Sequence, residues 1–454
     1  MPLGSQLSAL GDEPARSNPT ASNRQPEAGR APAWLAWSVW GAAAFFYLAG
    51  FYLRVSPAVM TNELMRAFNI TAGDLGNLSA VYFYTYVFMQ IPTGVLVDSW
   101  GAQRLLILGS IAAAIGTLIF GTTSNFVVAS TGRALVGGAT AVGWVVTLKL
   151  ATHWFPSQRF AMMSGLGLFM GNMGALVAQV PLRLAVEQFG WRAVIISSAV
   201  VVLLIAAFAW MLVRNDPHED GYESYAPEVL QSTTHLSIWT LLKGFRHVFA
   251  YRNTWLIFVA QGGFVGSILT FTGLWGPPYL RARFGVPATT AAAICSVMIV
   301  CWAVASPLCG HWSDKMKRRK PIYVTGGLVA AAGWVVMFLV PGLPLSAFTP
   351  IAAVTSFACG AVIIGFAYAK ESVPVQFLGT ISGATNVGNM LGPMLLQPAI
   401  GRVLDRHWSG DLVGGLRVYS PDAFRSGFVL IVGWAMTTVV LTCLTRETHC
   451  RQRG

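Results

Sequence analysis

The chain has 454 residues, of which 54% are hydrophobic and only 11% are charged. Its apolar residues occur in runs that are longer than the core of a water-soluble domain can bury, which excludes a soluble protein. The formal net charge of +12 is divided among short loops and forms no continuous basic face, so a nucleic-acid partner is not expected. We therefore predict an all-α integral membrane protein.

The first half of the chain begins with a polar segment. Residues 1–33 carry Pro, Ser, Asn and charges of both signs without periodicity, so we predict a disordered cytoplasmic tail that lacks the build of a cleaved signal peptide. Apolar stretches of about 20 residues then begin near positions 35, 75, 103, 126, 160 and 191. They are predicted to form an N-terminal six-helix bundle over residues 34–213.

The second half repeats this organisation. A cytoplasmic linker, residues 214–251, contains an amphipathic stretch, Ile238–Phe249, that we expect to lie along the membrane surface. Apolar stretches begin again near positions 254, 287, 321, 346, 376 and 424, and predict a C-terminal six-helix bundle over residues 252–446, followed by a cytoplasmic tail, 447–454. The polar loop from about 405 to 423 either covers the mouth of a site or only connects two helices.

Lysine and arginine set the predicted orientation of these twelve transmembrane helices. They are roughly twice as frequent in loops on the side of the N-terminus, for example in the run from Lys315 to Lys320, as in loops on the other side. The positive-inside rule therefore places both termini in the cytoplasm. We expect the protein in the inner membrane of a bacterium.

One motif occurs twice, at an offset of 216 residues. Its positions in the first half are Gly94, Asp98, Gly101 and Arg104. In the second half Gly310 and Asp314 recur, and Lys317 stands where the first copy has Gly101. Two halves in the same order indicate a parallel repeat, with a pseudo-two-fold axis along the membrane normal and a binding site between the halves near mid-membrane.

A second pattern recurs at offsets of 217 and 218 residues. Gly171-Asn172-Met173 and Gln179 in the first half correspond to Gly388-Asn389-Met390 and Gln397 in the second. The amide side chains either hydrogen-bond a solute or tie helices together, and the sequence does not decide between these roles. The glycines favour close helix packing.

Two motifs resemble those of the major facilitator superfamily. Gly94-x-x-x-Asp98-x-x-Gly101-x-x-Arg104 is similar to the signature loop between helices two and three of that family, and Gly132-Arg133-x-x-x-Gly137-Gly138 is similar to its helix-four arginine motif. The resemblance covers about residues 35–446. It implies two six-helix bundles that rock around a central cavity, which opens alternately to each side of the membrane.

The signature loop is expected to act as a gate. Asp98 lies at the cytoplasmic end of helix two, where its carboxylate would face the positive N-terminal end of helix eleven and the nearby Arg104, holding the inner side shut. The alternative is an ordinary turn in which Asp98 only caps a helix. We favour the gate because the motif recurs at Gly310 and Asp314, and Lys317 predicts a looser contact there.

Within the superfamily the likeness is greatest to the organophosphate antiporters and the related anion:cation symporters, the sugar-phosphate-permease-like group. Phe51-Tyr52-Leu53-Arg54 resembles the segment of helix one in which those proteins carry a substrate-binding arginine, which implies that Arg54 is an anion ligand. Phosphate-handling members carry a second arginine in helix seven, whereas the matching stretch here, Ser267–Thr272, has none. This difference favours a monocarboxylate over a doubly charged phosphate ester.

Physical reasoning leads to the same arginine. A charge within an apolar span is costly and by default suggests a function. Helices one and four each carry an arginine, a small residue and an aromatic residue on one face. The alternative is that Arg54 extends to the headgroups and that Arg133 pairs with backbone. The candidate substrate-binding residues are Arg54, Tyr47, Arg133, Trp144, Asn172, Gln179, Thr272, Asn386 and Asn389.

The predicted spans lack several kinds of functional group. No Asp or Glu lies in the middle of a predicted span, which disfavours a proton-driven exporter of cations, and Glu371 near a span end is a possible proton carrier. Histidine and cysteine have no metal-ligand spacing, so we expect neither a metal nor a cofactor. No predicted span contains a nucleophile with a neighbouring base, so we do not predict an enzyme. A monomer is expected, because the bundle completes its own cavity.

We therefore predict a secondary active or facilitative transporter that moves a small organic anion across the inner membrane by alternating access. An alternative is an exporter of neutral or amphipathic compounds, with an apolar pocket made by Phe45, Phe46, Trp144, Phe169 and Trp275. A third possibility is a transporter-like sensor that binds a solute and signals through its tail or linker.

Overall fold

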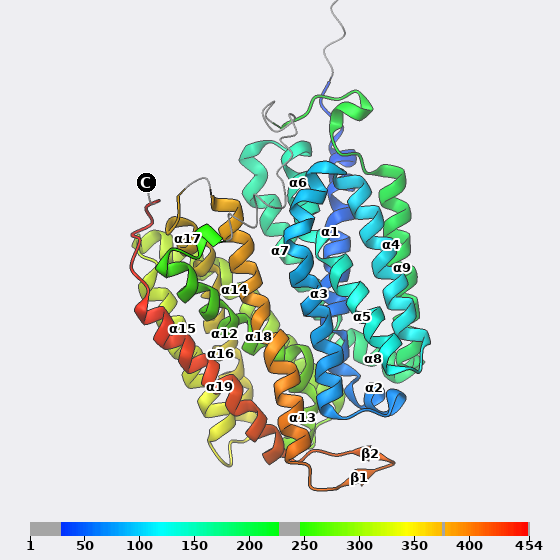
Figure 1. Ribbon diagram of the computed structural model, residues 1–454, viewed down its shortest axis with the longest axis vertical. Coiled ribbons are helices and arrows are strands. Elements are labelled where there is room, and N and C mark those ends of the chain that lie inside the picture. The colour runs from blue at the N-terminus through cyan, green and yellow to red at the C-terminus, as the bar shows by residue number, and fades with distance from the viewer. Residues whose placement is uncertain (1–28, 227–245, 375–376, 453–454) are drawn as a thin grey trace, which may run out of the picture.

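The computed structural model describes residues 29–226, 246–374 and 377–452. This part of the chain is almost entirely helical, and the helices form two bundles that lie side by side, one for each half of the sequence (Figure 1). The predicted all-α fold is confirmed. Residues 1–28 of the predicted tail and residues 238–245 of the predicted amphipathic stretch lie outside the described residues.

The first bundle is formed by helices between residues 33 and 212. In chain order they are α1 (Ala33–Val55), η1 (Ser56–Val59), α2 (Thr61–Phe68), α3 (Ala72–Ser99), α4 (Ala102–Thr122), α5 (Phe126–Thr140), α6 (Val142–Trp154), η2 (Ser157–Arg159), α7 (Phe160–Val177), α8 (Val180–Phe189) and α9 (Trp191–Leu212). The start of α3 is fixed by a capping box, in which the side chains of Thr71 and Asp74 each accept the other's backbone N–H.

The second bundle follows the linker turn η3 (Pro217–Asp220). Its elements are α12 (Arg252–Thr270), the π-helical turn η4 (Phe271–Trp275), α13 (Gly276–Phe284), α14 (Ala288–Met316), α15 (Lys320–Leu339), α16 (Leu345–Cys359), α17 (Val362–Glu371), α18 (Leu378–Arg406), β1 (Leu412–Val413), β2 (Leu416–Arg417) and α19 (Pro421–Leu444). The two short strands form an antiparallel hairpin within the polar loop before α19.

The twelve predicted spans are all found as helices. In the described part of the chain, ten helical segments are long and apolar enough to cross a membrane, and α3, bent by 53° just before Pro92, makes an eleventh. The twelfth is α18, which runs for 29 residues beside α3 but is made less apolar by its amides, glycines and prolines. Every span begins within three residues of its predicted start.

Backbone conformation repeats between the halves as the sequence does. α2 and α13 end at Asn69 (φ 52°) and Gly285 (φ 65°), and the signature loops turn at Gly101 (φ 87°) and Lys317 (φ 52°). Both pairs are separated by the offset of 216 residues. A residue with a side chain adopts this left-handed conformation at a cost of about 1–2 kcal/mol. The repeat therefore dictates the backbone even where the side chain is unfavourable.

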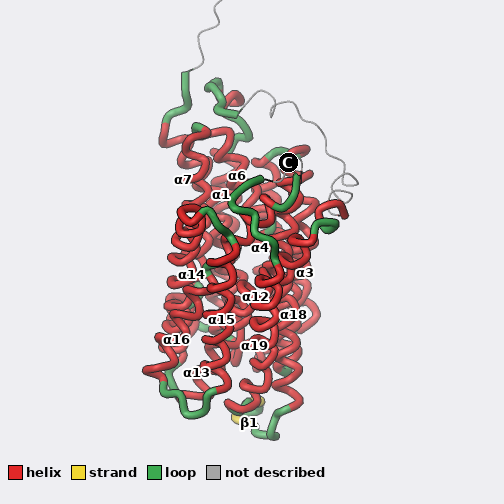
Figure 2. Tube along the Cα trace, turned by 90° about the vertical axis from the view of Figure 1, so that its left-hand side faces the viewer, coloured by secondary structure: helices red, strands yellow, loops and turns green. Residues whose placement is uncertain are grey.

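The two bundles meet at one end and diverge toward the other (Figure 1). We call the end that carries α2, α13 and the β1–β2 hairpin the hairpin end. We call the opposite end, which carries residues 29 and 452, the terminal end. Figure 2 shows the hairpin and the C-terminus at opposite ends of the elongated molecule.

Glycines allow α3 and α18 to approach closely at the hairpin end. A Cβ atom on Gly76 would lie 2.5 Å from the carbonyl oxygen of Gln397, and a Cβ atom on Gly401 would lie 2.3 Å from that of Ala72. Both distances are too short for any side chain. The closest approach of the bundles therefore depends on residues that leave room for the opposite backbone.

Hydrogen bonds extend this contact toward mid-membrane. The Tyr84 hydroxyl donates to the carbonyl oxygen of Met394 at 3.3 Å, and the Asn386 amide donates to Oε1 of Gln90 at 3.1 Å. Within the described residues, the second of these is the hydrogen bond between the bundles that lies nearest the terminal end. The two bundles are thus joined from the hairpin end to beyond the middle of the antiparallel α3–α18 pair.

Candidate substrate-binding site and gates

Arg54 lies near the end of α1, inside the first bundle, and is only 3% exposed. Its guanidinium carbon lies 4.3 Å from the ring centre of Phe51 and 4.6 Å from that of Tyr86. Its Nε donates to the Tyr82 hydroxyl at 3.4 Å, and among the described residues it has no ion pair with a carboxylate. Arg54 therefore does not extend to the headgroups; it is a buried cation held between aromatic rings.

Tyr82 of α3 links this arginine to a second one. Its hydroxyl donates to the carbonyl oxygen of Gly50 at 3.2 Å and lies 2.7 Å from Oγ1 of Thr140. Arg133 of α5 is 2% exposed, and its guanidinium carbon lies 5.1 Å from the Tyr82 ring centre. Arg133 Nη1 donates to the carbonyl oxygen of Leu53 at 2.7 Å. Its Nε and Nη2 are buried without a partner in the described structure.

The predicted aromatic wall is present beside these arginines. The Tyr47 ring centre lies 5.0 Å from that of Phe51 and 5.3 Å from that of Trp144. Gly171 of α7 makes room for this cluster, because a Cβ atom there would lie 2.8 Å from the Tyr47 ring. α1, α6 and α7 therefore join in one aromatic surface next to Arg54.

The two buried guanidinium groups determine what the site favours. Removing a cation from water without a counter-ion costs several kcal/mol, and a second cation nearby adds repulsion. Each cation–π contact returns only about 0.5–2 kcal/mol. An anionic ligand would supply the missing charge-assisted hydrogen bonds. The arrangement therefore favours an anion over a neutral or cationic solute.

The predicted amide residues separate into two groups. Gln179 is fully buried, and its Nε2 donates to the carbonyl oxygen of Thr272 in the other bundle at 3.0 Å. Asn386 also bonds across the bundles, so Gln179, Thr272 and Asn386 tie helices together. Asn172 is half-buried, and Asn389 has a buried Oδ1 without a partner in the described structure. Asn172 and Asn389 therefore remain candidates for contact with a solute.

The π-helical turn η4, which no sequence pattern indicated, lies between the bundles. It packs against η1 and α1 of the first bundle. Gln397, the counterpart of Gln179 in the repeat, donates to the carbonyl oxygen of Leu269 at 3.2 Å and accepts at its own carbonyl oxygen from Trp275 Nε1 at 3.0 Å. Turns of this kind are frequent at functional sites. The repeated glutamines were the only sequence signal for this contact.

Asp405, in the last turn of α18, joins the bundles at the hairpin end. Its carboxylate accepts the backbone N–H groups of Ala72 at 3.2 Å and Gly73 at 2.8 Å, at the start of α3. The Tyr419 hydroxyl donates to the same carboxylate at 2.6 Å, and Arg417 Nη1 lies 3.6 Å from it. A helix N-terminus stabilises a negative group through its unpaired N–H groups and its dipole.

We call the contact of Asp405 with Ala72 and Gly73 the hairpin-end latch. Sequence analysis did not place Asp405 among the gating residues. The available signal was an acid in the last turn of a helix, where the dipole of its own helix disfavours negative charge. Such an acid needs a partner outside its helix, and here the partner is the start of a helix in the other bundle.

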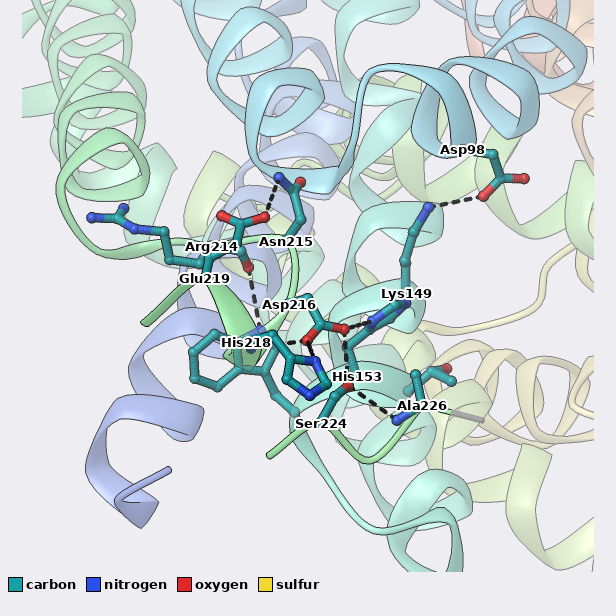
Figure 3. A network of polar contacts seen from close by, with 12 residues as sticks. Asp98, Lys149, His153, Arg214, Asn215, Asp216, His218, Glu219, Ser224 and Ala226 are labelled. Carbon is teal, nitrogen blue, oxygen red and sulfur yellow. Dashed lines mark hydrogen bonds and ion pairs between the residues drawn. The ribbon is translucent and has the colours of Figure 1, made fainter. Parts of the chain in front are cut away.

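The predicted gate at the signature loop is not engaged in this structure. Asp98 Oδ1 lies 2.9 Å from Nζ of Lys149 in the same bundle (Figure 3). Within the described residues, Asp98 has no hydrogen bond or ion pair with Arg104 or with α18. Gly101 makes a tight turn against the linker, since a Cβ atom there would lie 2.4 Å from Asn215 Oδ1. The contact of Asp98 with helix eleven stays a prediction for another conformation.

The second copy of the motif belongs to an ion-pair network inside the second bundle. Arg319 lies 2.5 Å from Asp314 and 2.7 Å from Glu371. Burial lowers the pKa of Arg319, but the hydrogen bonds that Arg319 donates to Glu371 and Asp314 raise it more, so its pKa lies above the ordinary value. Glu371 thus has a structural partner, and its role as a proton carrier stays a prediction. Within the part of the chain that the structure describes, Gly94 and Gly310 have no close neighbour at their Cβ positions.

The start of the linker is fastened to the first bundle beside Lys149 (Figure 3). Oxygens of the Asp216 carboxylate lie 2.6 Å from Nδ1 of His153 and 2.8 Å from Nδ1 of His218, and Ser224 donates to it at 2.8 Å. Burial raises the pKa of Asp216, but hydrogen bonds from these groups outweigh burial and hold the pKa below its usual range. The network holds the linker against the end of α6.

The five aromatic residues of the alternative apolar pocket are widely distributed. Phe46 and Trp275 are 1% and 2% exposed and belong to the cores of different bundles, whereas Phe45 and Phe169 are 56% and 57% exposed. Only Trp144 lies in the aromatic surface beside Arg54. This distribution does not favour a shared apolar pocket.

The fold is similar to that of solved transporters. The crystal structure of a bacterial homolog of the human lysosomal transporter Spinster, in an inward-facing and unoccupied conformation, matches with a TM-score of 0.72 and 17% sequence identity. The match covers 91% of this chain and 97% of that one. At this identity the likeness shows the fold alone.

Sequence comparison identifies the family. The chain is 22% identical over 398 residues to the probable sulfoacetate transporter SauU of Cupriavidus necator, covering 82% of this chain and 88% of that protein. It is 22% identical over 391 residues to the membrane sensor protein UhpC of Escherichia coli, covering 83% and 87%. The family model of the Major Facilitator Superfamily matches residues 39–397. This chain therefore belongs to the major facilitator superfamily.

Proposed function

We propose that this protein is a secondary transporter of a small organic anion and that Arg54 binds the anionic group. The observation that carries the proposal is a guanidinium group that is 3% exposed and has no carboxylate partner among the described residues. Arg133, with two buried nitrogens that have no partner among the described residues, adds positive charge beside Tyr82. The similarity to a probable sulfoacetate transporter supports an organic acid as the solute class.

The partners of the two arginines favour a solute with one acidic group. Arg133 already donates to a backbone carbonyl, whereas Arg54 makes a single long hydrogen bond through Nε. One carboxylate or sulfonate on Arg54 would satisfy the guanidinium fork. The amides of Asn172 and Asn389 would then contact a polar body of the same solute.

The difference between the two ends of the molecule supports alternating access. The hairpin-end latch holds one end together, while the bundles diverge at the other (Figure 1). We propose that the terminal end is the cytoplasmic side of an inner membrane, because arginine and lysine are concentrated there. In the opposite conformation Asp98 would leave Lys149 and face the start of α18, as Asp405 now faces the start of α3.

A solute sensor is the second candidate, favoured by the similarity to the sensor protein UhpC. A sensor needs the same buried binding site but no release of the solute on the far side. Binding and transport must therefore be measured separately.

The test combines both measurements on the full-length protein. Uptake of radiolabelled sulfoacetate by proteoliposomes would be measured beside thermal stabilisation by a panel of small carboxylates, phosphate esters, neutral solutes and lipophilic cations. A ligand that binds the folded state raises the melting temperature. We expect stabilisation by an acid and an uptake loss of at least about a hundredfold in Arg54→Ala, because a buried charge pair is removed.

Two further variants serve as controls. Arg54→Lys keeps the charge but loses the planar fork, and should retain part of the uptake. Arg159→Ala removes an exposed arginine and should leave uptake unchanged. Normal uptake by Arg54→Ala would refute the proposed site. Acid binding without uptake in any variant would favour the sensor, and equal stabilisation of both proteins by lipophilic compounds alone would favour the exporter.

A further inference from the structure

A pocket of about 310 Å³ opens at the hairpin end, outside the latch. Both bundles line it. The first bundle contributes Thr61, Asn62 and Met65 of α2, and the second contributes α13, the β1–β2 hairpin and the start of α19. The pocket therefore lies over the joint between the bundles, where a solute would enter or leave if that end opened.

Two arginines give this pocket its charge. Arg281 of α13 is exposed, and among the described residues its side chain has no hydrogen bond or ion pair. Arg417 of β2 lies with its guanidinium carbon 4.3 Å from the ring centre of Trp408 and with Nη1 3.6 Å from Asp405. Among the described residues, those that line the pocket include no Asp or Glu. An anion in the pocket would therefore meet the positive charge of Arg281 and would share Arg417 with Asp405.

The floor and wall of the pocket are suited to the carbon skeleton of a small acid. Met65, Trp275 and Phe424 supply apolar surface, while Asn62 and Thr61 supply polar groups. The Trp275 side chain is held through Nε1 by the carbonyl oxygen of Gln397, in the helix that carries the latch. A few positioned polar groups on an apolar wall are typical of sites for small ligands.

We propose that this pocket is a second binding site for the transported organic anion, at the hairpin-side mouth of the transport path. The proposal rests on the proposed function and adds a second place where the same carboxylate or sulfonate is held. Arg281 and Arg417 bind the acidic group, and Trp275 lines the apolar side of the site.

Occupation of the pocket would act on the latch, because the two share residues. Arg417 lies between the pocket and Asp405, and Tyr419 both lines the pocket and donates to Asp405. A carboxylate bound by Arg417 competes with Asp405 for that guanidinium and brings a second negative charge beside it. An anion at the mouth therefore weakens the contact that keeps the hairpin end closed.

The test uses a thiol placed in the pocket of the otherwise cysteine-free full-length protein. Asn62→Cys would be modified with the anionic reagent 2-sulfonatoethyl methanethiosulfonate and, separately, with the cationic 2-(trimethylammonio)ethyl methanethiosulfonate. The rate with the anionic reagent divided by the rate with the cationic reagent reports local charge, because changes in access affect both reagents alike. We expect this ratio to fall about three- to tenfold at low ionic strength when Arg281→Gln and Arg417→Gln are combined.

Two controls complete the experiment. Arg406→Gln removes a positive charge from an exposed position at the same end but outside the pocket, and should leave the ratio unchanged. Sodium sulfoacetate should slow modification of Asn62→Cys, whereas choline chloride at equal ionic strength should not. This protection should persist in an Arg54→Ala background, since it does not depend on the interior site.

The outcomes separate this proposal from the proposed function. The mouth site would be overturned by a rate ratio that does not change when Arg281 and Arg417 are replaced, or by sulfoacetate protection that vanishes in Arg54→Ala. Either result would leave the proposed role of Arg54 intact. Normal sulfoacetate uptake by Arg54→Ala, with protection of Asn62→Cys intact, would overturn the interior site and leave the mouth site standing.

Discussion

The two ends of the α3–α18 pair use the same chemical group in different ways. At the hairpin end, Asp405 of one bundle accepts backbone N–H groups from the first residues of a helix in the other. At the terminal end, Asp98 pairs with Lys149 inside its own bundle. The helices are antiparallel, so each carries an acid in its last turn near the place where the other begins.

This difference shows how a gate can be built without a dedicated partner side chain. A carboxylate at the start of a helix in the other bundle binds backbone groups that are always present, and this contact weakens as the two bundles move apart. A carboxylate that finds a lysine in its own bundle leaves the two bundles free to separate. The end of the molecule that is closed is then the end at which the acid bridges the two bundles.

The largest effect on closure of the hairpin end is expected from a substitution that prevents the close approach of α3 and α18. In Gly401→Val, Cβ would lie 2.3 Å from the Ala72 carbonyl oxygen and 3.0 Å from Gly73 Cα, so the hairpin end could not close. We expect uptake to fall by more than about tenfold. Pulsed EPR distances between spin labels at the exposed positions Phe189 and Arg406 should lengthen.

Gly433→Val is the matched control for this substitution. It places the same side chain in an exposed part of α19 where no atom lies within 4 Å of the added Cβ. Both variants should insert in the membrane equally well. An unchanged label distance in Gly401→Val would contradict the assignment of this contact as the closed gate.

A smaller effect is expected from removing only the charge of the latch. Asp405→Asn keeps the shape of the side chain but loses the charge that faces the start of α3, at a cost of about 1–2 kcal/mol. The ratio of closed to open hairpin ends should fall roughly tenfold, which the same pair of spin labels would measure. Asp411→Asn, in the exposed loop nearby, should leave the ratio as it is. A shift of equal size in both variants would show a general effect of charge.

The smallest effect is expected at the terminal end, in the opposite direction. Lys149→Met frees Asp98, which is 58% exposed, to face the start of α18. An exposed ion pair contributes at most about 1 kcal/mol, so we expect a shift of only two- to fivefold toward a closed terminal end. Labels at the exposed positions Arg159 and Lys370 should move closer. Lys149→Arg keeps the positive charge and should show the parent distance. An increase in the label distance in Lys149→Met would show that Lys149 itself supports closure.

Local patterns predicted much of the architecture because their causes are local. The span boundaries follow from hydropathy, and the turn at Gly101 follows from a glycine placed between two apolar stretches. Arg54 was found because a charge in an apolar span stands out in any membrane protein. Even the backbone of Lys317 could be expected from its place in the repeat, although its side chain disfavours that conformation.

Contacts between the bundles were predicted less well. Gln179 was assigned either to a solute or to helix contact, and only the structure shows its bond to the Thr272 carbonyl oxygen. Asp98 was expected to bridge the bundles and pairs with Lys149, whereas Asp405 bridges them and was not identified. Each of these bonds joins residues more than 50 positions apart, so no spacing in the sequence reveals them.

Hydropathy and residue order thus predicted the membrane location, the twelve helices, their twofold repeat and an arginine within the first helix. These depend on the hydropathy and order of residues within single helices, which are the same in every conformation of the protein. The packing of the two bundles shows which acid holds which end, that Arg54 is buried, how η4 fits between the bundles and where a pocket opens at the hairpin end. Those features depend on the relative position of two bundles, which changes during transport while the sequence does not.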